Sequence, residues 1–385
     1  MTSLTAQYIY SLPLLAMTPI LQEPFITNRI NTIDILRGFA LYGIVLAHVA
    51  SVYLYEFRIM PDELTGIDGK LKRLLEFFIE RKFYLIFSFL FGLSFSIQFQ
   101  NALHRKKPFV LKYCWRLGIL FFIGFIHNQF YPFDILQVYA IIGLLLLPIR
   151  KFAPSTLLAI AVTFFIFSCL FQHFDNPIKN VLLIWRFHKV GLSATFTHQF
   201  VSGNHFMIIC MFVLGLWAGK KKIFSYKGIE TSFFKILLLC SLTTLISVKI
   251  INDLIDISSI DVSAINICFS FLYISCICLL YKHFPNMKLL WKSLEVIGRM
   301  GLTNYILQTI FFFSLFQFSD LPLNEGGLYL LFIYANFFFI FQALISIAWF
   351  KRYPFGPIEW LWRITTNLYK ETPDMQKTSC ETELK

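Results

Sequence analysis

The sequence has few charged residues for its length. Asp, Glu, Lys and Arg make up 15% of its 385 residues, whereas hydrophobic residues make up 57% and Phe alone occurs 46 times. The mean hydropathy is +0.65, which is more than a water-exposed surface could accommodate. A soluble protein is therefore excluded, and we expect an integral membrane protein in contact with the lipid bilayer.

Metal-ligand clusters and redox-active cysteine pairs are also missing. The eight cysteines lie almost all in apolar segments without a Cys-x-x-Cys pair, and the eight histidines form no cluster at metal-ligand spacing. No metal site is therefore expected. The net charge of +12 falls mostly in short connections between apolar runs, where it indicates membrane topology and not a nucleic-acid partner.

Apolar runs long enough to cross a bilayer recur along the chain. A transmembrane helix needs about 20 residues, and length and basic flanks together predict spans near residues 34–55, 83–100, 109–127, 134–149, 153–172, 200–219, 232–251, 262–281, 301–318 and 327–350. The sequence thus predicts an all-α integral membrane protein, a polytopic bundle of about ten transmembrane helices. Residues 31–368 form the single transmembrane domain in this interpretation, residues 1–30 an interfacial segment and residues 369–385 a disordered cytoplasmic tail.

Basic residues gather in connections on one side of the predicted spans. They are concentrated in residues 104–107, 150–151, 220–222, 282–292 and 351–352. The positive-inside rule makes that side cytoplasmic. The connections 56–82 and 173–199 on the other side also carry Lys or Arg, which weakens the pattern without reversing it. An even number of spans then places both termini in the cytoplasm.

The first span contains three ionisable residues, Asp34, Arg37 and His48. Asp34 and Arg37 share one helical face, and His48 lies eleven residues, or about three turns and 16 Å, beyond Arg37 on that face. The first two can be an interfacial anchor, and a neutral histidine can simply bridge two helices by a hydrogen bond. The alternative is that all three line a functional passage.

A second group of polar residues spans a six-residue connection. His127 ends the third predicted span and Asp134 begins the fourth, so the two helices are antiparallel neighbours and a contact between these side chains is feasible. Such a carboxylate would fix the tautomer of the imidazole and raise its basicity, as a general base requires. A polar helix cap and turn at the membrane interface is the alternative interpretation.

Two further segments carry polar groups near the predicted cytoplasmic side. In residues 298–309, Arg299 precedes Asn304, Tyr305 and Gln308, which enter a span. These three polar side chains can line a functional site, or they can simply hydrogen-bond to neighbouring helices. Residues 353–363 predict a short amphipathic helix carrying Arg363, which would either anchor the chain at the surface or close the cytoplasmic mouth. The stripe Ser88, Gly92 and Ser96 is typical of close helix packing.

Five of these stretches resemble a known family when they are taken together and in order. They are RINTIDILRGFALYGIVL (29–46), KFYLIFSFLFGLSFSI (82–97), GFIHNQFYPFDILQVYAIIG (124–143), GRMGLTNYILQT (298–309) and FGPIEWLWR (355–363). The chain is similar to the bacterial YeiB-like family, domain of unknown function 418, in the transmembrane acyltransferase superfamily that also contains the lysosomal heparan N-acetyltransferase. The more distant acyltransferase-3 group resembles the chain in the spacing of Asp34, Arg37 and His48. In the YeiB-like family, the position of His48 is more often Asn, so His127 is a second candidate for the catalytic histidine.

The resemblance implies a bacterial inner-membrane enzyme that moves an acyl group, acetyl in the simplest case, from cytoplasmic acyl-CoA to a hydroxyl or amine of an envelope glycan, lipid or small molecule. Arg37, Arg299 and Arg363 would then bind the phosphates of coenzyme A. His48 is preferred for the chemistry and His127 for acceptor handling, with Asp34 or Asp134 as orienting carboxylates and Asn304, Tyr305 or Gln308 as oxyanion donors. The rival is a transporter or lipid-handling channel that uses the same groups as a relay or gate, and a homo-oligomer stays open in either case.

Overall fold

A computed structural model describes residues 30–57, 64–131, 134–173, 199–200, 202–225, 228–255, 262–318 and 327–368. Almost all of these residues are α-helical. Within the described part, the only sheet is a small antiparallel hairpin of β1 (Phe224–Ser225) and β2 (Gly228–Ile229). The tail 369–385 and residues 1–29 of the predicted interfacial segment lie outside the described residues.

Each predicted span corresponds to helical structure. The apolar helices are α1 (Asn31–Phe57), α3 (Lys82–His104), α4 (Val110–His127), α5 (Leu136–Gly143), α6 (Leu146–Ile149), α7 (Pro154–His173), α10 (Asn204–Lys220), α11 (Thr231–Ile255), α12 (Val262–His283), α14 (Gly301–Phe318) and α15 (Gly327–Phe350). Three amphipathic helices accompany them, namely α2 (Gly66–Phe78), α13 (Lys288–Arg299) and α16 (Pro357–Leu368). The sequence predicted only the last of these three.

The described residues contain seven helical stretches that are long and apolar enough to cross a membrane, while α10 and α14 are shorter. An all-α polytopic membrane protein is therefore confirmed, but the count of ten spans is not. The fourth predicted span is interrupted between α5 and α6. Pro148 lies in α6, and a proline removes one helical hydrogen bond and clashes with the carbonyl four residues earlier, which here is Leu144 in the break.

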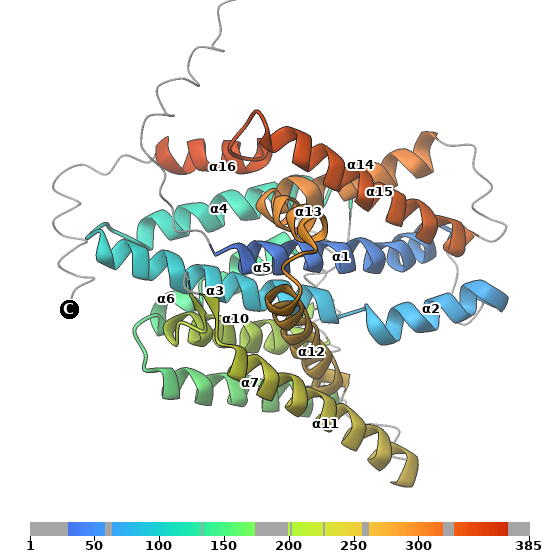
Figure 1. Ribbon diagram of the computed structural model, residues 1–385, viewed down its shortest axis with the longest axis horizontal. Helices are drawn as coiled ribbons and strands as arrows, with labels where there is room; N and C mark the ends of the chain where they lie inside the picture. Colours follow the sequence, from blue (N-terminus) through green and yellow to red (C-terminus); the bar gives the residue numbers. More distant parts are fainter. Residues whose placement is uncertain are drawn as a thin grey trace, which may run out of the picture.

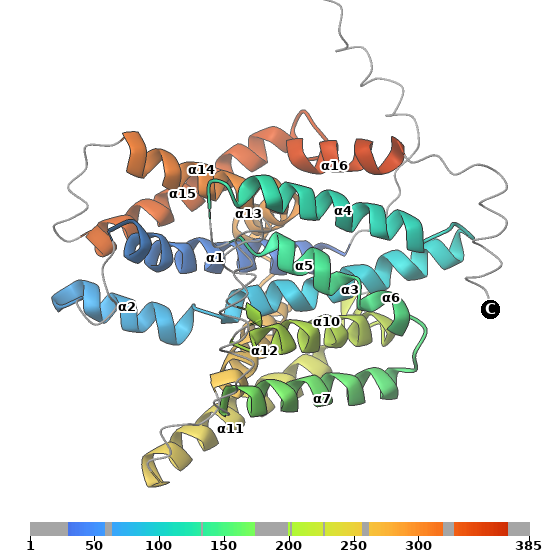
Figure 2. The same ribbon diagram turned by 180° about the vertical axis from the view of Figure 1, so that it is seen from behind.

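Helix α1 lies in the middle of the bundle. It packs against α3 on one side and against α13, α14 and α15 on the other (Figures 1 and 2). Its side chains Leu36, Leu41, Val45 and Val49 have almost no exposed surface, because neighbouring helices surround it on several sides. Any polar group on α1 must therefore find its partners within the protein.

Small residues bring α3 and α10 into close contact, as the stripe Ser88, Gly92 and Ser96 predicted. A Cβ atom on Gly92 would lie 1.9 Å from a backbone oxygen of α10, and one on Gly219 would lie 2.4 Å from the Ser96 side chain. The helices pack at a separation that only glycine permits at these positions. The stripe is a packing surface.

Helices α14 and α16 are joined by hydrogen bonds in both directions. The Glu359 carboxylate accepts from the N–H groups of Leu302 (2.7 Å) and Thr303 (3.0 Å) and from the Thr303 hydroxyl (2.6 Å), and that hydroxyl accepts from the N–H of Ile358 at 3.2 Å. Each helix therefore helps to satisfy the unpaired N–H groups at the start of the other. Helix α16 also packs along α4.

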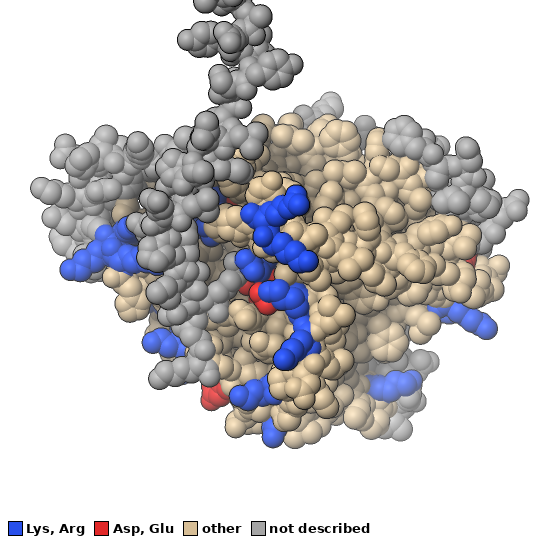
Figure 3. All heavy atoms as spheres, turned by 45° about the horizontal axis from the view of Figure 1, so that its top comes forward, with Lys and Arg blue, Asp and Glu red and all other residues tan. Residues whose placement is uncertain are grey.

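One end of the bundle, which we call the basic end, contains the end of α3, the start of α4, the turn between α6 and α7 and the end of α10 (Figures 1 and 2). There the Lys220 ammonium donates to the Phe152 carbonyl at 2.6 Å, and Arg150 lies over the Phe99 ring of α3. Helix α13 and the turn that follows α15 carry further exposed cations, and Lys and Arg form a band on the face shown in Figure 3.

The contact between α3 and α10 can be tested at Gly215, whose added Cβ would lie 2.0 Å from the Phe89 carbonyl oxygen. We expect Gly215→Ala to lower the thermal unfolding midpoint of the purified protein, because overpacking a tight contact costs about 1–3 kcal/mol. The matched control is Gly118→Ala on α4, where a Cβ meets no atom within 4 Å. The control should unfold at the wild-type temperature or slightly above it; equal destabilisation in both variants would contradict the assignment.

Candidate functional site

Polar and aromatic side chains from distant parts of the chain meet inside the bundle, opposite the basic end. This group, the histidine cluster, consists of His48 of α1, His127 at the end of α4, Tyr131 and Asp134 in the connection to α5, and Tyr305 and Thr309 of α14. Three separate regions of the sequence contribute to it. The cluster therefore exists only in the folded protein.

Asp134 is the fixed point of the histidine cluster, with no exposed surface. Its Oδ1 lies 2.9 Å from His127 Nδ1 and accepts from the Tyr305 hydroxyl at 3.4 Å, and its Oδ2 accepts from the Gln137 N–H at 3.2 Å. A Cβ on Gly124 would lie 2.9 Å from Oδ2, so glycine in α4 makes room for the carboxylate. The predicted contact of His127 with Asp134 is confirmed.

His127 links this carboxylate to a hydroxyl group. Its Nε2 lies 2.8 Å from the Thr309 hydroxyl, on the opposite side of the ring from Asp134. Because an ionised carboxylate can only accept hydrogen bonds, the ring hydrogen belongs on Nδ1, and the neutral Nε2 accepts from the Thr309 hydroxyl. Asp134, His127 and Thr309 thus form a continuous carboxylate, imidazole and hydroxyl chain.

His48 lies in the same cluster but differs in its bonding. Its ring centroid is 4.8 Å from that of Tyr131 and 5.9 Å from that of Tyr305, and His127 lies 5.8 and 5.1 Å from the same two rings. The two histidines therefore lie beside the same two tyrosine rings. His48 Nδ1 is buried and has no hydrogen-bond partner in the described structure.

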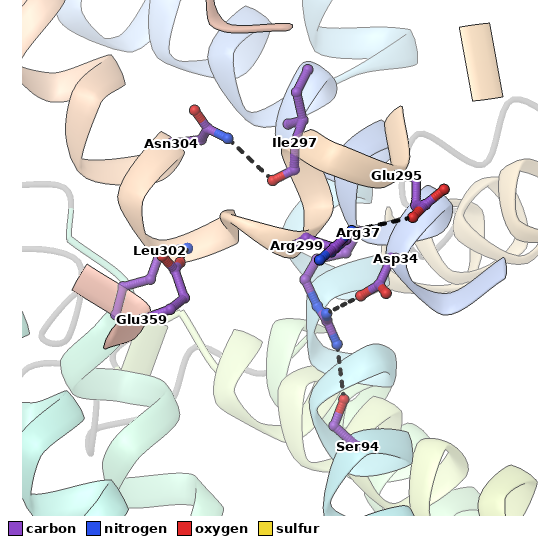
Figure 4. Close-up of polar contacts among 9 residues, drawn as sticks. All are labelled: Asp34, Arg37, Ser94, Glu295, Ile297, Arg299, Leu302, Asn304 and Glu359. Atoms are coloured by element: carbon purple, nitrogen blue, oxygen red, sulfur yellow. Dashed lines mark hydrogen bonds and ion pairs between the residues drawn. The ribbon is translucent and has the colours of Figure 1, made fainter. Parts of the chain in front are cut away.

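Arg37 and Asp34 form an ion pair toward the basic end. Arg37 donates to the Asp34 carboxylate at 2.8 Å and to the Ser94 hydroxyl of α3 at 3.1 Å (Figure 4). The Arg37 side chain is 26% exposed and that of Asp34 only 5%. Asp34 therefore orients Arg37 and lies apart from both histidines, and the guanidinium stays accessible to a ligand.

The other two predicted phosphate-binding arginines also lie near the start of α14. Arg299 contacts the Glu295 carboxylate at 3.7 Å (Figure 4) and lies 3.9 Å over the Phe350 ring. Arg363 is exposed and lies 3.9 Å over the Phe355 ring. Each guanidinium group is therefore packed against the face of an aromatic ring.

Asn304 and Gln308 are used in helix packing. The Asn304 amide donates to the Ile297 carbonyl (3.1 Å) and the Ser346 hydroxyl (3.3 Å), and the Gln308 amide donates to the Leu41 carbonyl (3.3 Å). Both hydrogens of Asn304 are thus engaged, which favours the alternative of hydrogen bonding between helices over an oxyanion-binding role. Tyr305 joins the histidine cluster instead.

Sequence reasoning did not identify Thr309 or Tyr131 as site residues. Thr309 ends the stretch GRMGLTNYILQT and lies four residues after Tyr305, on the same helical face. That spacing was the available signal. A threonine in a transmembrane helix ordinarily bonds its own backbone, however, and its partner here is 182 residues away.

Comparison with known proteins identifies relatives along nearly the whole chain. Residues 29–247 match the family described as Heparan-alpha-glucosaminide N-acetyltransferase, catalytic, and residues 218–369 match the family described as Protein of unknown function (DUF418). No solved structure matches the chain.

Three relatives align over most of their length. An uncharacterized 39.9 kDa protein of the amylase 3′ region of Bacillus acidopullulyticus is 30% identical and covers 88% of this chain and 94% of its own. The uncharacterized protein YxaH of Bacillus subtilis is 28% identical, with 90% and 96% covered. The uncharacterized protein YeiB of Escherichia coli is 25% identical, with 91% and 100% covered.

The N-acetyltransferase match spans more than half of the chain, and the DUF418 match completes it toward the C-terminus. The chain therefore belongs to the YeiB-like family of membrane proteins, in the superfamily of transmembrane acyltransferases.

Proposed function

We propose that the chain transfers an acyl group, acetyl in the simplest case, from cytoplasmic acyl-CoA to a hydroxyl or amine of an envelope acceptor. The observation that carries this proposal is the hydrogen-bonded chain of Asp134, His127 and Thr309. A carboxylate, an imidazole and a hydroxyl in this order form an acyl-transfer constellation that recurs on unrelated folds. The N-acetyltransferase match supports the same chemistry.

The first half of the reaction acylates Thr309. His127 Nε2 takes the hydroxyl proton of Thr309 while the oxygen attacks the thioester carbonyl carbon, and the Nδ1 contact with Asp134 stabilises the imidazolium that forms. Collapse of the tetrahedral intermediate breaks the carbon–sulfur bond. The leaving thiolate receives the proton from His127 and departs as free CoA thiol.

The second half returns the enzyme to its starting state. His127 removes a proton from the acceptor hydroxyl or amine, which attacks the acyl-Thr309 ester, and the same proton then reprotonates the Thr309 oxygen. His48 Nδ1 is buried and has no partner in the described structure, so we assign His48 to hydrogen bonding with the substrate. This reverses the sequence preference for His48 as the base, because His127 has the carboxylate and the hydroxyl.

Helix α14 runs from the arginines that would bind the donor to the Thr309 hydroxyl that would react with it. The Arg37 side chain packs at Gly301, with its Cδ 3.2 Å from the position of an added Cβ, and Thr309 lies eight residues further, about 12 Å along a helix axis. A donor whose phosphates bind Arg37 must therefore extend its thioester arm over that distance. The long flexible arm of coenzyme A suits this arrangement, and Arg299 and Arg363 add positive charge beside the same end.

The role of Thr309 can be tested with two conservative variants. Thr309→Val keeps the shape but removes the hydroxyl, and we expect it to abolish both CoA release from acetyl-CoA and labelling of the protein, whereas Thr309→Ser should retain both. Peptide mass spectrometry should place the acyl group on Thr309 of the wild type. Thr163→Val is the control, since that exposed hydroxyl bonds only its own helix. Uptake of a substrate into proteoliposomes without thioester cleavage would instead support a transporter.

Asparagine substitutions separate the roles of the two histidines. Asn can hydrogen-bond but cannot act as a base, so His127→Asn should lower the rate of acyl transfer by about 10²- to 10⁴-fold. His48→Asn should stay within a few-fold of wild type, and His48→Ala should lose more. The readout is the rate of CoA thiol release, with thermal unfolding as the test of folding. An inactive His48→Asn beside an active His127→Asn would reverse the assignment.

A further inference from the structure

A polar stripe runs along α3 from the basic end to Arg37. Ser94, Gln98 and Asn101 are spaced four and three residues apart, which places them on one helical face, and Arg105 follows directly after the end of α3. Ser94 and Gln98 are half-buried, and Asn101 and Arg105 are exposed. This face differs from the stripe of Ser88, Gly92 and Ser96, which packs against α10, because it carries larger polar groups and reaches the surface.

Each of the two more buried residues of this stripe accepts a hydrogen bond from an arginine. Ser94 accepts a hydrogen bond from Arg37, and one turn further the Gln98 carbonyl oxygen accepts from Arg116 of α4 at 2.8 Å. Arg116 lies within an apolar helix that is long enough to cross the membrane. An arginine at such a position is costly unless it pairs, reaches water or binds a ligand.

Arg116 lacks a carboxylate partner of the kind that Arg37 and Arg299 have. Arg37 pairs with Asp34 and Arg299 with Glu295, whereas Arg116 forms no ion pair with any residue that the structure describes. Its guanidinium instead lies 5.0 Å from the centre of the Trp362 ring on α16. Stacking on an indole supports the cation but leaves its charge uncompensated.

The groups next to Arg116 are also hydrogen-bond donors. The indole N–H of Trp362 is buried and has no hydrogen-bond partner among the described residues, and a buried N–H without an acceptor costs about 1–3 kcal/mol. Arg363, the next residue of α16, is exposed and adds a second cation beside Trp362 in the sequence. The Arg116 guanidinium, which has no carboxylate partner among the described residues, and the unused indole N–H of Trp362 therefore belong to two side chains in direct contact.

We propose that Arg116 and Trp362 form a binding site for a phosphate-bearing anion between α3, α4 and α16. A phosphate group supplies the negative charge that Arg116 lacks and an acceptor oxygen for the Trp362 N–H, and its geometry matches that of guanidinium. The proposal deepens the proposed function and rests on it where the phosphate belongs to the acyl donor. A phospholipid headgroup carries the same chemistry and is the other source.

The site can be tested by binding alone, without turnover. Unacylated CoA is titrated into the full-length protein in a nonionic detergent, and its affinity is compared for wild type, Arg116→Gln, Arg116→Lys and Trp362→Phe. We expect Arg116→Gln to lower the affinity for CoA by at least about tenfold, and Arg116→Lys to lower it less. Trp362→Phe should lower the affinity by a few-fold, because that variant keeps an aromatic ring and loses only the N–H. Lys235→Gln, an exposed change on α11, should leave the affinity unchanged.

Two further measurements distinguish the sources of the phosphate and the failure of either proposal. The first measurement is the amount of phosphatidylglycerol that the protein keeps bound when it is released from nanodiscs for native mass spectrometry. If the donor occupies the site, Arg116→Gln should keep as much lipid as the wild type. Reduced lipid retention with unchanged CoA affinity assigns the site to a lipid headgroup. Thr309→Val should bind CoA as wild type does, so loss of acyl transfer is separable from loss of binding. Unchanged CoA affinity and unchanged lipid retention in a folded Arg116→Gln protein would overturn the anion site.

Discussion

The wholly buried carboxylate of Asp134 is the constraint around which the rest of the site is arranged. A charge placed in an apolar interior is tolerated only when hydrogen-bond donors surround it. Asp134 receives them from His127, Tyr305 and the backbone of Gln137. These groups come from three helices, and their shared partner fixes α4, α5 and α14 relative to one another. The position of the imidazole, and through it that of Thr309, follows from this arrangement.

The two ends of the bundle differ in how they treat charge. At the basic end the arginines rest on aromatic rings or on polar residues of α3 and keep part of their surface accessible, as the 26% exposure of Arg37 shows. In the histidine cluster Asp134, His127, Thr309 and Tyr305 are joined by hydrogen bonds away from solvent. In the proposed reaction, an anionic donor would therefore be recruited where water still reaches the protein, and acyl transfer would take place where a competing water molecule has little access. Helix α14 begins beside the first region and passes through the second.

Much of the fold was predictable because bilayer thickness imposes a length on each apolar run. Local contacts were also within reach of the sequence: Asp34 with Arg37 follows from a three-residue spacing, and His127 with Asp134 from a short turn. Contacts between distant helices were not, since no periodicity in α4 indicates that Thr309 lies beside His127. The break between α5 and α6 shows a second limit, because an apolar run reports hydrophobicity but not the consequence of one proline.

The adjacency of His48 and His127 explains why only one of them suits proton transfer. When His127 takes a proton, the imidazolium lies against the Asp134 carboxylate, and the pair carries no net charge. His48 contacts the aromatic rings of Tyr131, Tyr305 and Phe312 and forms no ion pair with a described residue, so protonating it would create an uncompensated charge in an apolar site. It would also place two positive rings beside the same tyrosines, where the low local polarity makes their repulsion strong. His48 is therefore confined to neutral hydrogen bonding. An amide at that position satisfies the same requirement, whereas no amide can replace His127.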